Sequence, residues 1–395
     1  MEDSGSFERP TQDEMGRDIA SLFRGAVRLV IENVLQEEVR DLVGARRYER
    51  LSSRTDHRNG TYLRRLLTSM GLIEIAMPRA RESGSPTEVI GRYRRRSAEV
   101  DRMVTTAYVE GVSTRDMNRV TEALMGEGIS RSTVSRVTKV LGEQVESLRR
   151  EPIEGPVPYI YLDGTFLDAR WARKVENVAA LVAYGVMMDG HRRLLAVTIG
   201  AEESEDSWGE LLGQLLERGL SGVQLVIADA HRGLIQAVRH HLPEAARQRC
   251  IVHLERNVLT KVPPRLRARV ASQLRNIFEA PDLAEAKKRL RAFAAGLGQQ
   301  VPEALCCLEA GFADATQYYS FPEEHRTRIR STNGLERLHG EVKRRIRSIS
   351  AFPDRESALR LITAVALQTT RIWSDRRYLD MSLLKKEATA TEGVA

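Results

Sequence analysis

The stretch Pro158-Tyr159-Ile160-Tyr161-Leu162-Asp163-Gly164-Thr165-Phe166-Leu167-Asp168 decides the fold. It follows the turn-like Glu154-Gly155-Pro156 and has the aromatic and aliphatic residues of a buried strand, with a carboxylate set among them. A buried charge is costly unless it meets a partner or a metal ion. Asp163 is therefore the first candidate for a functional residue.

Two further segments carry a carboxylate in a comparable place. The stretch 223–229 has the pattern of a strand that ends at Asp229, and the residues after it open a helix. A second helix start, residues 332–339, carries Glu336, which lies 107 residues beyond Asp229 (336 − 229). Neighbouring strand ends and a crossing helix can bring three such carboxylates together.

An all-oxygen cluster of this kind suits Mg²⁺ or Mn²⁺ rather than zinc. Two such ions about 3.5–4 Å apart clamp the attacking and leaving oxygens of an in-line phosphoryl displacement. The competing interpretation is structural: each acid is a helix cap or half of an ion pair. Asp229 would cap the next helix, and Glu336 would close a capping box begun by Asn333.

The order of elements around Asp163 favours an α/β fold. We expect strands near 157–168, 176–188 and 192–199, a helix at 207–218, a strand at 223–229, a helix at 233–241 and a short strand at 249–252. This order is typical of a ribonuclease H-like catalytic core, which we assign to residues 151–253 and 331–380. Residues 254–330 are almost all helical in pattern and predict an all-helical insertion, and 381–395 predict a flexible tail.

The region before the core predicts a mainly helical DNA-binding part with a small β-hairpin. Residues 1–45 contain a disordered tail and amphipathic helices, usable for packing or for pairing with a second protomer. The basic hairpin region 46–97 is compatible with a phosphate backbone or with a solvated charged face. Residues 98–150 resemble a helix-turn-helix, with Arg131 and Arg136 as candidate DNA contacts, although an ordinary helical hairpin has the same pattern.

Composition narrows the class of protein. The chain has 395 residues, 42% of them hydrophobic, and a net charge of +7, which favours an anionic partner or simply solubility. Three cysteines make no disulfide framework, no apolar run reaches the length of a membrane span, and the polar start is no signal peptide. We therefore expect a cytoplasmic protein that is not associated with a membrane.

Four motifs together resemble the mutator-like transposases of bacterial insertion sequences, a group with a DDE catalytic triad. The resemblance spans about residues 58–373, and its motifs are 162–165 (LDGT), 227–234 (IADAHRGL), 248–257 (QRCIVHLERN) and 331–337 (STNGLER), with 321–325 (FPEEH) upstream of the last. The resemblance implies Asp163, Asp229 and Glu336 as the triad, two Mg²⁺ (or Mn²⁺) per active site, and cutting and joining at the terminal inverted repeats of the element. One departure is His339, where many members have Asn.

The resemblance also suggests binding partners, and two alternative functions stay open. We expect double-stranded DNA, both element ends and target, and a homodimer or higher oligomer in synapsis, with Lys343, Arg344 and Arg345 on phosphates. A non-catalytic DNA-binding protein descended from a transposase, or a structure-specific nuclease, remains an alternative function. No Gly-x-Ser-x-Gly and no phosphate-binding glycine-rich loop is present in the sequence.

Three motif residues keep open roles. Cys250 and His253 form a Cys-x-x-His pair, but a zinc site would lack two ligands, and Cys306 and Cys307 are adjacent and awkward for tetrahedral geometry. We therefore favour a structural or DNA-positioning role for the pair. His231 would contact a phosphate or a backbone carbonyl.

Overall fold

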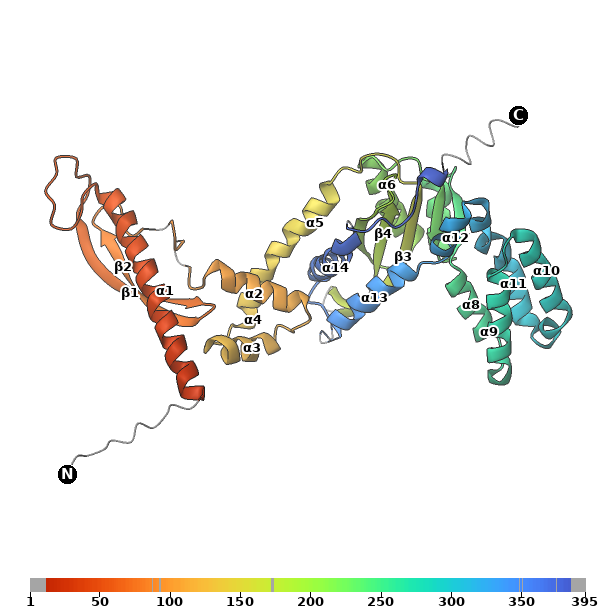
Figure 1. Ribbon diagram of the computed structural model, residues 1–395, viewed down its shortest axis with the longest axis horizontal. Helices are drawn as coiled ribbons and strands as arrows, with labels where there is room; N and C mark the ends of the chain where they lie inside the picture. The colour runs from red at the N-terminus through yellow and green to blue at the C-terminus, as the bar shows by residue number, and fades with distance from the viewer. Residues whose placement is uncertain are drawn as a thin grey trace, which may run out of the picture. The chain divides into compact units, whose positions relative to one another are not determined.

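The computed structural model describes residues 12–86, 88–91, 94–171, 174–347, 349, 351–373 and 375–384. The chain forms two compact units, Met1–Lys139 and Val140–Ala395, which are treated separately (Figure 1). The two predicted tails fall largely outside the described residues, at 1–11 and 385–395. No helix in the described part of the chain has the length and apolar character that a bilayer span requires.

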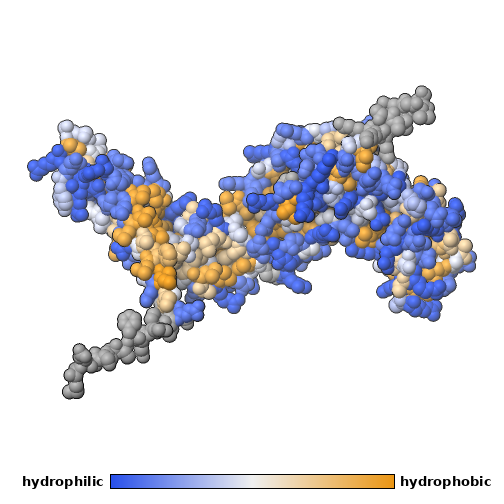
Figure 2. Space-filling view, in the orientation of Figure 1, coloured by the Kyte–Doolittle hydropathy of each residue, from blue (hydrophilic) through white to orange (hydrophobic). Residues whose placement is uncertain are grey.

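In the first unit, one long helix packs on a β-hairpin. Helix α1 (Gln12–Val43) covers strands β1 (Arg58–Thr68) and β2 (Gly71–Ala80), which pair antiparallel around the turn at 69–70. Its inner face contributes Leu35 to a core with Ile75 and Met77 of β2. Its other face leaves apolar side chains exposed, and Figure 2 shows them gathered along this helix. These exposed residues are Met15, Ile19, Leu22, Phe23, Leu29 and Val30.

Three short helices complete the first unit. They are α2 (Ala98–Val109), α3 (Asp116–Met125) and α4 (Arg131–Val137), and they share an apolar core with Leu67 of the hairpin. Ser130 caps α4 by accepting from the Thr133 amide. Helix α4 ends before Thr138, whose hydroxyl donates back to the Val134 carbonyl, an arrangement that bends helices.

The second unit is built on a mixed five-stranded sheet. Its strands are β3 (Tyr159–Trp171), β4 (Lys174–Val186), β5 (Arg192–Gly200), β6 (Leu225–Ala228) and β7 (Ala246–Arg249). The order is β5-β4-β3-β6-β7, with β4 antiparallel to both of its neighbours, β6 parallel to β3 and β7 parallel to β6. The α/β class is therefore confirmed.

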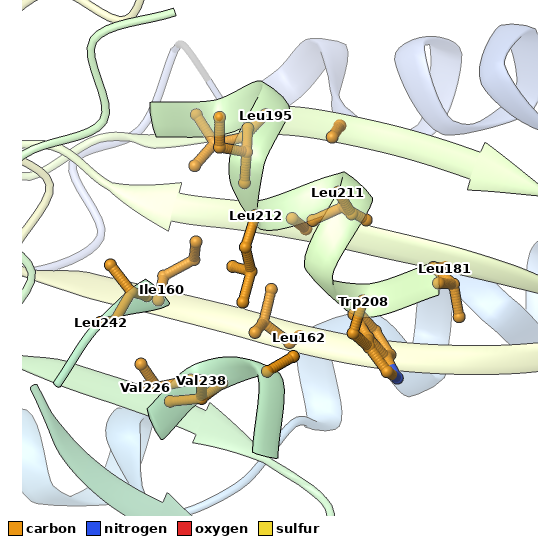
Figure 3. Close-up of a cluster of buried hydrophobic side chains, with 14 of the residues drawn as sticks. Ile160, Leu162, Leu181, Leu195, Trp208, Leu211, Leu212, Val226, Val238 and Leu242 are labelled. Carbon is orange, nitrogen blue, oxygen red and sulfur yellow. The ribbon is translucent and has the colours of Figure 1, made fainter. Parts of the chain in front are cut away.

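Helices cover both faces of this sheet. On one face, α6 (Glu205–Glu217) and α7 (Arg232–His241) bury Trp208 and Leu212 against Leu162 of β3 (Figure 3). Side chains alternate along a strand, so Tyr161 and Asp163 point to the opposite face. There they meet α12 (Glu323–Ile329) and α13 (Asn333–Ile346), and α14 (Arg355–Thr370) lies against β3 and β5.

Between β7 and α13 the chain forms a helical subdomain. It contains α8 (Ile251–Thr260), α9 (Pro264–Phe278), α10 (Leu283–Ala295), α11 (Pro302–Ala315) and then α12. Its ends meet, because the Ile251 amide donates to the Arg330 carbonyl at 3.1 Å. Buried His325 of the FPEEH motif anchors α12, with its Nδ1 2.8 Å from the Tyr159 hydroxyl and its Nε2 3.0 Å from the Asp380 carbonyl oxygen.

One predicted strand was misplaced. We expected a strand at 249–252, but β7 occupies 246–249 and residue 251 already begins α8. The reason is that the Cys250 amide donates to the Ala228 carbonyl at 2.7 Å, which ends the ladder with β6 and turns the chain into the helix. The remaining elements are α5 (Leu141–Arg150) and the 3-10 turns Thr138–Val140, Leu297–Gln300, Gln317–Ser320 and Arg371–Trp373.

Candidate active site

The sheet register brings Asp163 and Asp229 to the same place. Tyr161 of β3 pairs with Ile227 of β6 in parallel, and two further residues along each strand lead to the two aspartates. Equivalent positions in parallel strands face the same side of a sheet. Both carboxylates therefore lie at the carboxyl end of β6, on the face covered by α13.

The Asp163 carboxylate is buried, with the residue 8% exposed, and it is held by two contacts. Its Oδ1 accepts from the Gly164 amide at 3.1 Å, and its Oδ2 lies 3.3 Å from His339 Nδ1. The other ring nitrogen of His339 is buried without a hydrogen-bond partner among the described residues, as is the Thr165 hydroxyl two positions along β3. Two buried polar atoms without a hydrogen-bond partner therefore lie beside Asp163, on the same face of the strand.

Asp229 does not cap the helix that follows it. Its Oδ1 accepts from the neighbouring Ala230 amide at 2.6 Å. The N-cap residue of α7 is His231, and no side chain accepts a capping hydrogen bond there. The capping alternative for Asp229 is therefore wrong. Its carboxylate is half-buried and follows directly after the end of β6.

The Glu336 carboxylate is held by α8. Its Oε1 and Oε2 accept from Arg256 Nη1 and Nη2 at 2.7 and 3.3 Å, and His253 Nε2 lies 3.5 Å from Oε1. The N-cap of α13 is Thr332, one residue earlier than a capping box with Asn333 requires, and no side chain caps it. The capping-box alternative is therefore wrong, but the other structural alternative, half of an ion pair, is met by the contact with Arg256.

Cys250 connects the elements that carry Asp229 and Glu336. Its amide donates to Ala228 at the end of β6, and its buried sulfur accepts from the amide and hydroxyl of Thr332, at 3.4 and 3.3 Å. These contacts of Cys250 are compatible with a structural role. Cys306 and Cys307 lie on α11, and no group of three His, Cys, Asp or Glu side chains in the described residues is arranged to hold a metal ion.

The pKa of His253 depends on Cys250 and also on the charges of Asp229 and Asp163. The pKa of His253 is raised to about 9, chiefly by the neighbouring Cys250 sulfur and to a smaller extent by the charges of Asp229 and Asp163, whereas burial opposes the rise. The imidazole is therefore cationic at neutral pH and lies between the aspartates and Glu336.

A fourth carboxylate, Glu203, was missed by the sequence analysis. It lies between β5 and α6, and a Cβ placed on Gly164 would be 3.2 Å from its carboxyl carbon. Burial raises the pKa of Glu203, and the charges of Asp163 and Asp229 add to the rise, whereas His231 lowers it. His231 Nδ1 lies 4.0 Å from Glu203 Oε1, a carboxylate partner that differs from both expectations for His231.

The basic residues predicted to bind DNA differ in accessibility. Lys343 and Arg344 of α13 are exposed, whereas Arg345 is buried, and both arginines contact Glu341. Arg344 and then Arg345 lower the pKa of Glu341 to about 2, and burial opposes them. Arg131 and Arg136 are exposed on α4 of the first unit. The chain thus offers Lys343, Arg344, Arg131 and Arg136 to solvent.

Known proteins resemble this chain over most of its length. The transposase for insertion sequence element ISRM5 of Rhizobium meliloti (strain 1021) is 35% identical over 364 residues, 92% of each chain. The transposase for IS406 of Burkholderia multivorans is 35% identical over 88% of this chain and 90% of its own. The transposase for IS256 in transposon Tn4001 of Staphylococcus aureus is 33% identical over 95% of each.

A chain from a simian T-cell lymphotropic virus intasome complex with a PP2A regulatory subunit matches 43% of this chain and 70% of its own length, at 13% identity. Its TM-score of 0.16 is too low to support an argument about fold. The sequence profile of the Mutator family of transposases matches residues 2–375. The profile spans both structural units, and the relatives agree with it: this chain belongs to the Mutator family of transposases.

Proposed function

We propose that the protein is a DDE transposase with a ribonuclease H-like catalytic core. It cleaves the ends of its mobile element by hydrolysis and joins the freed 3′-hydroxyl to target DNA. The observation that carries this proposal is the meeting of Asp163 and Asp229 on neighbouring parallel strands, with the Glu336 helix tethered to the same strand end through Cys250. A protein that only binds DNA has no physical need for acids at two neighbouring strand ends and on a helix tethered to them.

The donor chemistry of the site fits Mg²⁺ or Mn²⁺. The aspartates offer only oxygen ligands, and the unpartnered His339 Nε2 and Thr165 hydroxyl beside Asp163 leave polar atoms for water or phosphate. Two such ions, when bound, would activate the attacking water and stabilise the leaving oxygen. Asp163, Asp229 and Glu336 would hold them, and His339 would keep the Asp163 carboxylate oriented.

In this arrangement Glu336 is ion-paired with Arg256, so this ion pair has to break before Glu336 can join the aspartates. Arg256 is 60% exposed in its side chain, and a DNA phosphate is a bidentate acceptor equivalent to a carboxylate. When DNA arrives, Arg256 moves to a phosphate, and Glu336 turns toward the aspartates. Cleavage competence is thereby coupled to the presence of substrate.

DNA recognition falls to the first unit in this proposal. Helices α2, α3 and α4 share one core in the manner of a helix-turn-helix, and Arg131 and Arg136 of α4 would contact the inverted repeat. Lys343 and Arg344 would contact phosphates near the cleavage site. The exposed apolar face of α1 would pair protomers during synapsis, and the protein would act at the nucleoid.

Incubation of the purified protein with Mg²⁺ and DNA bearing the element end tests this function. Cleavage followed by joining supports the transposase. Cleavage without joining indicates a structure-specific nuclease, and binding without any strand cleavage indicates a DNA-binding protein that has lost catalysis. The DNA flanking the gene supplies the element end for this assay.

A further inference from the structure

A basic hollow of about 1030 Å³ lies on the first unit, beside the β-hairpin. Its lining comes from β1, β2, the loop 83–86 and Arg95. The turn between α3 and α4 contributes Glu127. The hollow therefore adjoins the helices that the proposed function assigns to the inverted repeat.

Positive charge dominates the hollow. Four arginine side chains line it: Arg64, Arg65, Arg79 and Arg95. Glu127 is the one carboxylate in the described lining. Arg65 Nε is paired with Glu74 Oε1 at 3.2 Å, but the described part of the chain offers the other three arginines no carboxylate within ion-pair distance. Three guanidinium charges are thus left for an anion from outside.

Neutral contacts hold two of these guanidinium groups in place. Arg64 Nη2 donates to the Gly91 carbonyl at 3.1 Å and also to the Arg94 carbonyl. Arg79 stacks on Tyr62, with its Cζ 4.1 Å from the centre of the ring. Because carbonyls and an aromatic ring carry no net charge, these contacts order the arginines without neutralising them. Ordering before a ligand arrives lowers the entropic cost of binding.

The third arginine, Arg95, is fixed through its backbone. Its carbonyl accepts from the Leu67 amide of β1 at 2.9 Å, and the next residue forms a parallel bridge with Leu67. The segment that carries Arg95 is thereby attached to the hairpin. The three arginines therefore belong to one framework of β1, β2 and the segment bonded to them.

Duplex DNA fits this lining. Each strand carries a phosphate about every 3.4 Å along the helix axis, and guanidinium groups bind phosphate oxygens bidentately. Pockets for small molecules are mostly apolar and have volumes of about 300–1,000 Å³. This hollow, by contrast, is lined mainly by charged and polar residues.

We propose that the hollow binds phosphates of the element-end DNA, beside the base pairs that α4 would contact. The proposal rests on the proposed function, because it extends DNA recognition from α4 to the hairpin. Phosphate contacts fix the register of a protein on the duplex but carry no sequence information directly. The hollow therefore adds affinity and orientation, and α4 supplies sequence preference.

The salt dependence of DNA binding by the full chain tests the proposal. Fluorescence anisotropy compares the element-end duplex with a random duplex of equal length at several salt concentrations. The double variant Arg79→Gln/Arg95→Gln should bind both duplexes about 10-fold or more weakly near 0.1 M salt. The slope of log affinity against log salt should become shallower by about 2, since each lost phosphate contact removes about 1.

Arg47→Gln/Arg50→Gln is the matched control. Both arginines are exposed in the same unit and lie outside the hollow, and Arg47 also lies over a tyrosine ring, that of Tyr48. We expect this pair to change the slope by less than about 0.5. Equal losses in the two double variants would mean that only the net charge of the unit matters, and would overturn the proposal.

Glu127→Gln gives an effect of opposite sign. It removes the exposed carboxylate from the lining, so a phosphate in the hollow is no longer repelled, and both duplexes should bind several-fold more tightly. Unchanged or weaker binding in a folded Glu127→Gln protein would count against a phosphate at this place. This variant keeps the proposal testable if the arginine pair fails to fold.

The same assay separates this proposal from the proposed function. If the parent protein binds neither duplex, the DNA-binding function itself is wrong. If the parent prefers the element end and Arg79→Gln/Arg95→Gln binds as the parent does, DNA recognition stands and the hollow is only a solvated charged surface.

Discussion

The two sides of the candidate site hold their carboxylates by different means. Asp163 and Asp229 are placed by the backbone ladder between β3 and β6, and each receives one hydrogen bond from a neighbouring amide. Glu336 is placed by side chains, through Arg256 and His253 of α8. The ladder breaks only if the sheet unfolds, whereas an ion pair exchanges partners. The aspartate side is therefore a fixed platform, and the glutamate side is the part that would respond to DNA in the proposed function.

The largest effect is expected on the fixed side. Asp163→Asn or Asp229→Asn keeps the side-chain shape but removes the charge that would hold the proposed metal ions, so strand cleavage should fall by about 10³-fold or more. DNA binding, measured by mobility shift, should change little. Cleavage that persists in Asp163→Asn at ordinary Mg²⁺ would remove the basis for treating the aspartates as the platform.

On the responsive side, Glu336→Gln should also abolish cleavage, since Gln cannot supply the charge. The matched control is Glu341→Gln on the same helix, where the carboxylate only pairs with Arg344 and Arg345. We expect that variant to keep cutting. Side-by-side cleavage assays decide the point, and an active Glu336→Gln with an inactive Glu341→Gln would reverse the assignment.

A smaller effect is expected from releasing Glu336. Arg256→Gln removes its bidentate partner, so the protein without DNA should bind Mn²⁺ several-fold more tightly, as competition for the carboxylate is lost. The gain should vanish in the double variant with Glu336→Gln, by calorimetry. An unaltered Mn²⁺ affinity in Arg256→Gln would show that the ion pair does not restrain Glu336.

The smallest effect concerns the tie between the two sides. Cys250→Ala leaves the Thr332 amide and hydroxyl without their buried acceptor and should destabilise the protein by about 1–3 kcal/mol. Cys250→Ser retains an acceptor and should lose less. Denaturant unfolding of the two variants measures the difference, and equal stabilities would exclude the sulfur as a significant acceptor.

Much of the fixed side could be predicted from the sequence. The patterns at 157–168 and 223–229 indicate buried strands, and parallel pairing of neighbouring strands brings their carboxylates together. The sequence pattern did not predict where β7 ends, because a single hydrogen bond sets that point. The Cys250 amide ends the ladder, and β7 stops three residues before the end of the predicted strand. The ion pairs of Glu341 were predictable because i,i+3 and i,i+4 neighbours share a helix face.

The responsive side could not be predicted in the same way. Arg256 and Glu336 lie 80 residues apart, and nothing local to either marks them as partners. Glu203 sits in the run Glu202-Glu203-Ser204-Glu205-Asp206, where a polar loop before a helix is the ordinary explanation for acids. The usable signal was the glycine after Asp163, because a strand interior rarely has a reason to omit a side chain unless something approaches closely.

The closure of the helical subdomain has a consequence for how such chains diversify. Its first and last residues, Ile251 and Arg330, share one hydrogen bond. The chain therefore leaves the core and returns to it at adjacent positions. The length of the chain between these two residues therefore does not set the spacing between the sheet and α13. The part of the subdomain between α8 and α12 can therefore vary in length among related chains, as long as α8 keeps Arg256 and His253 beside Glu336.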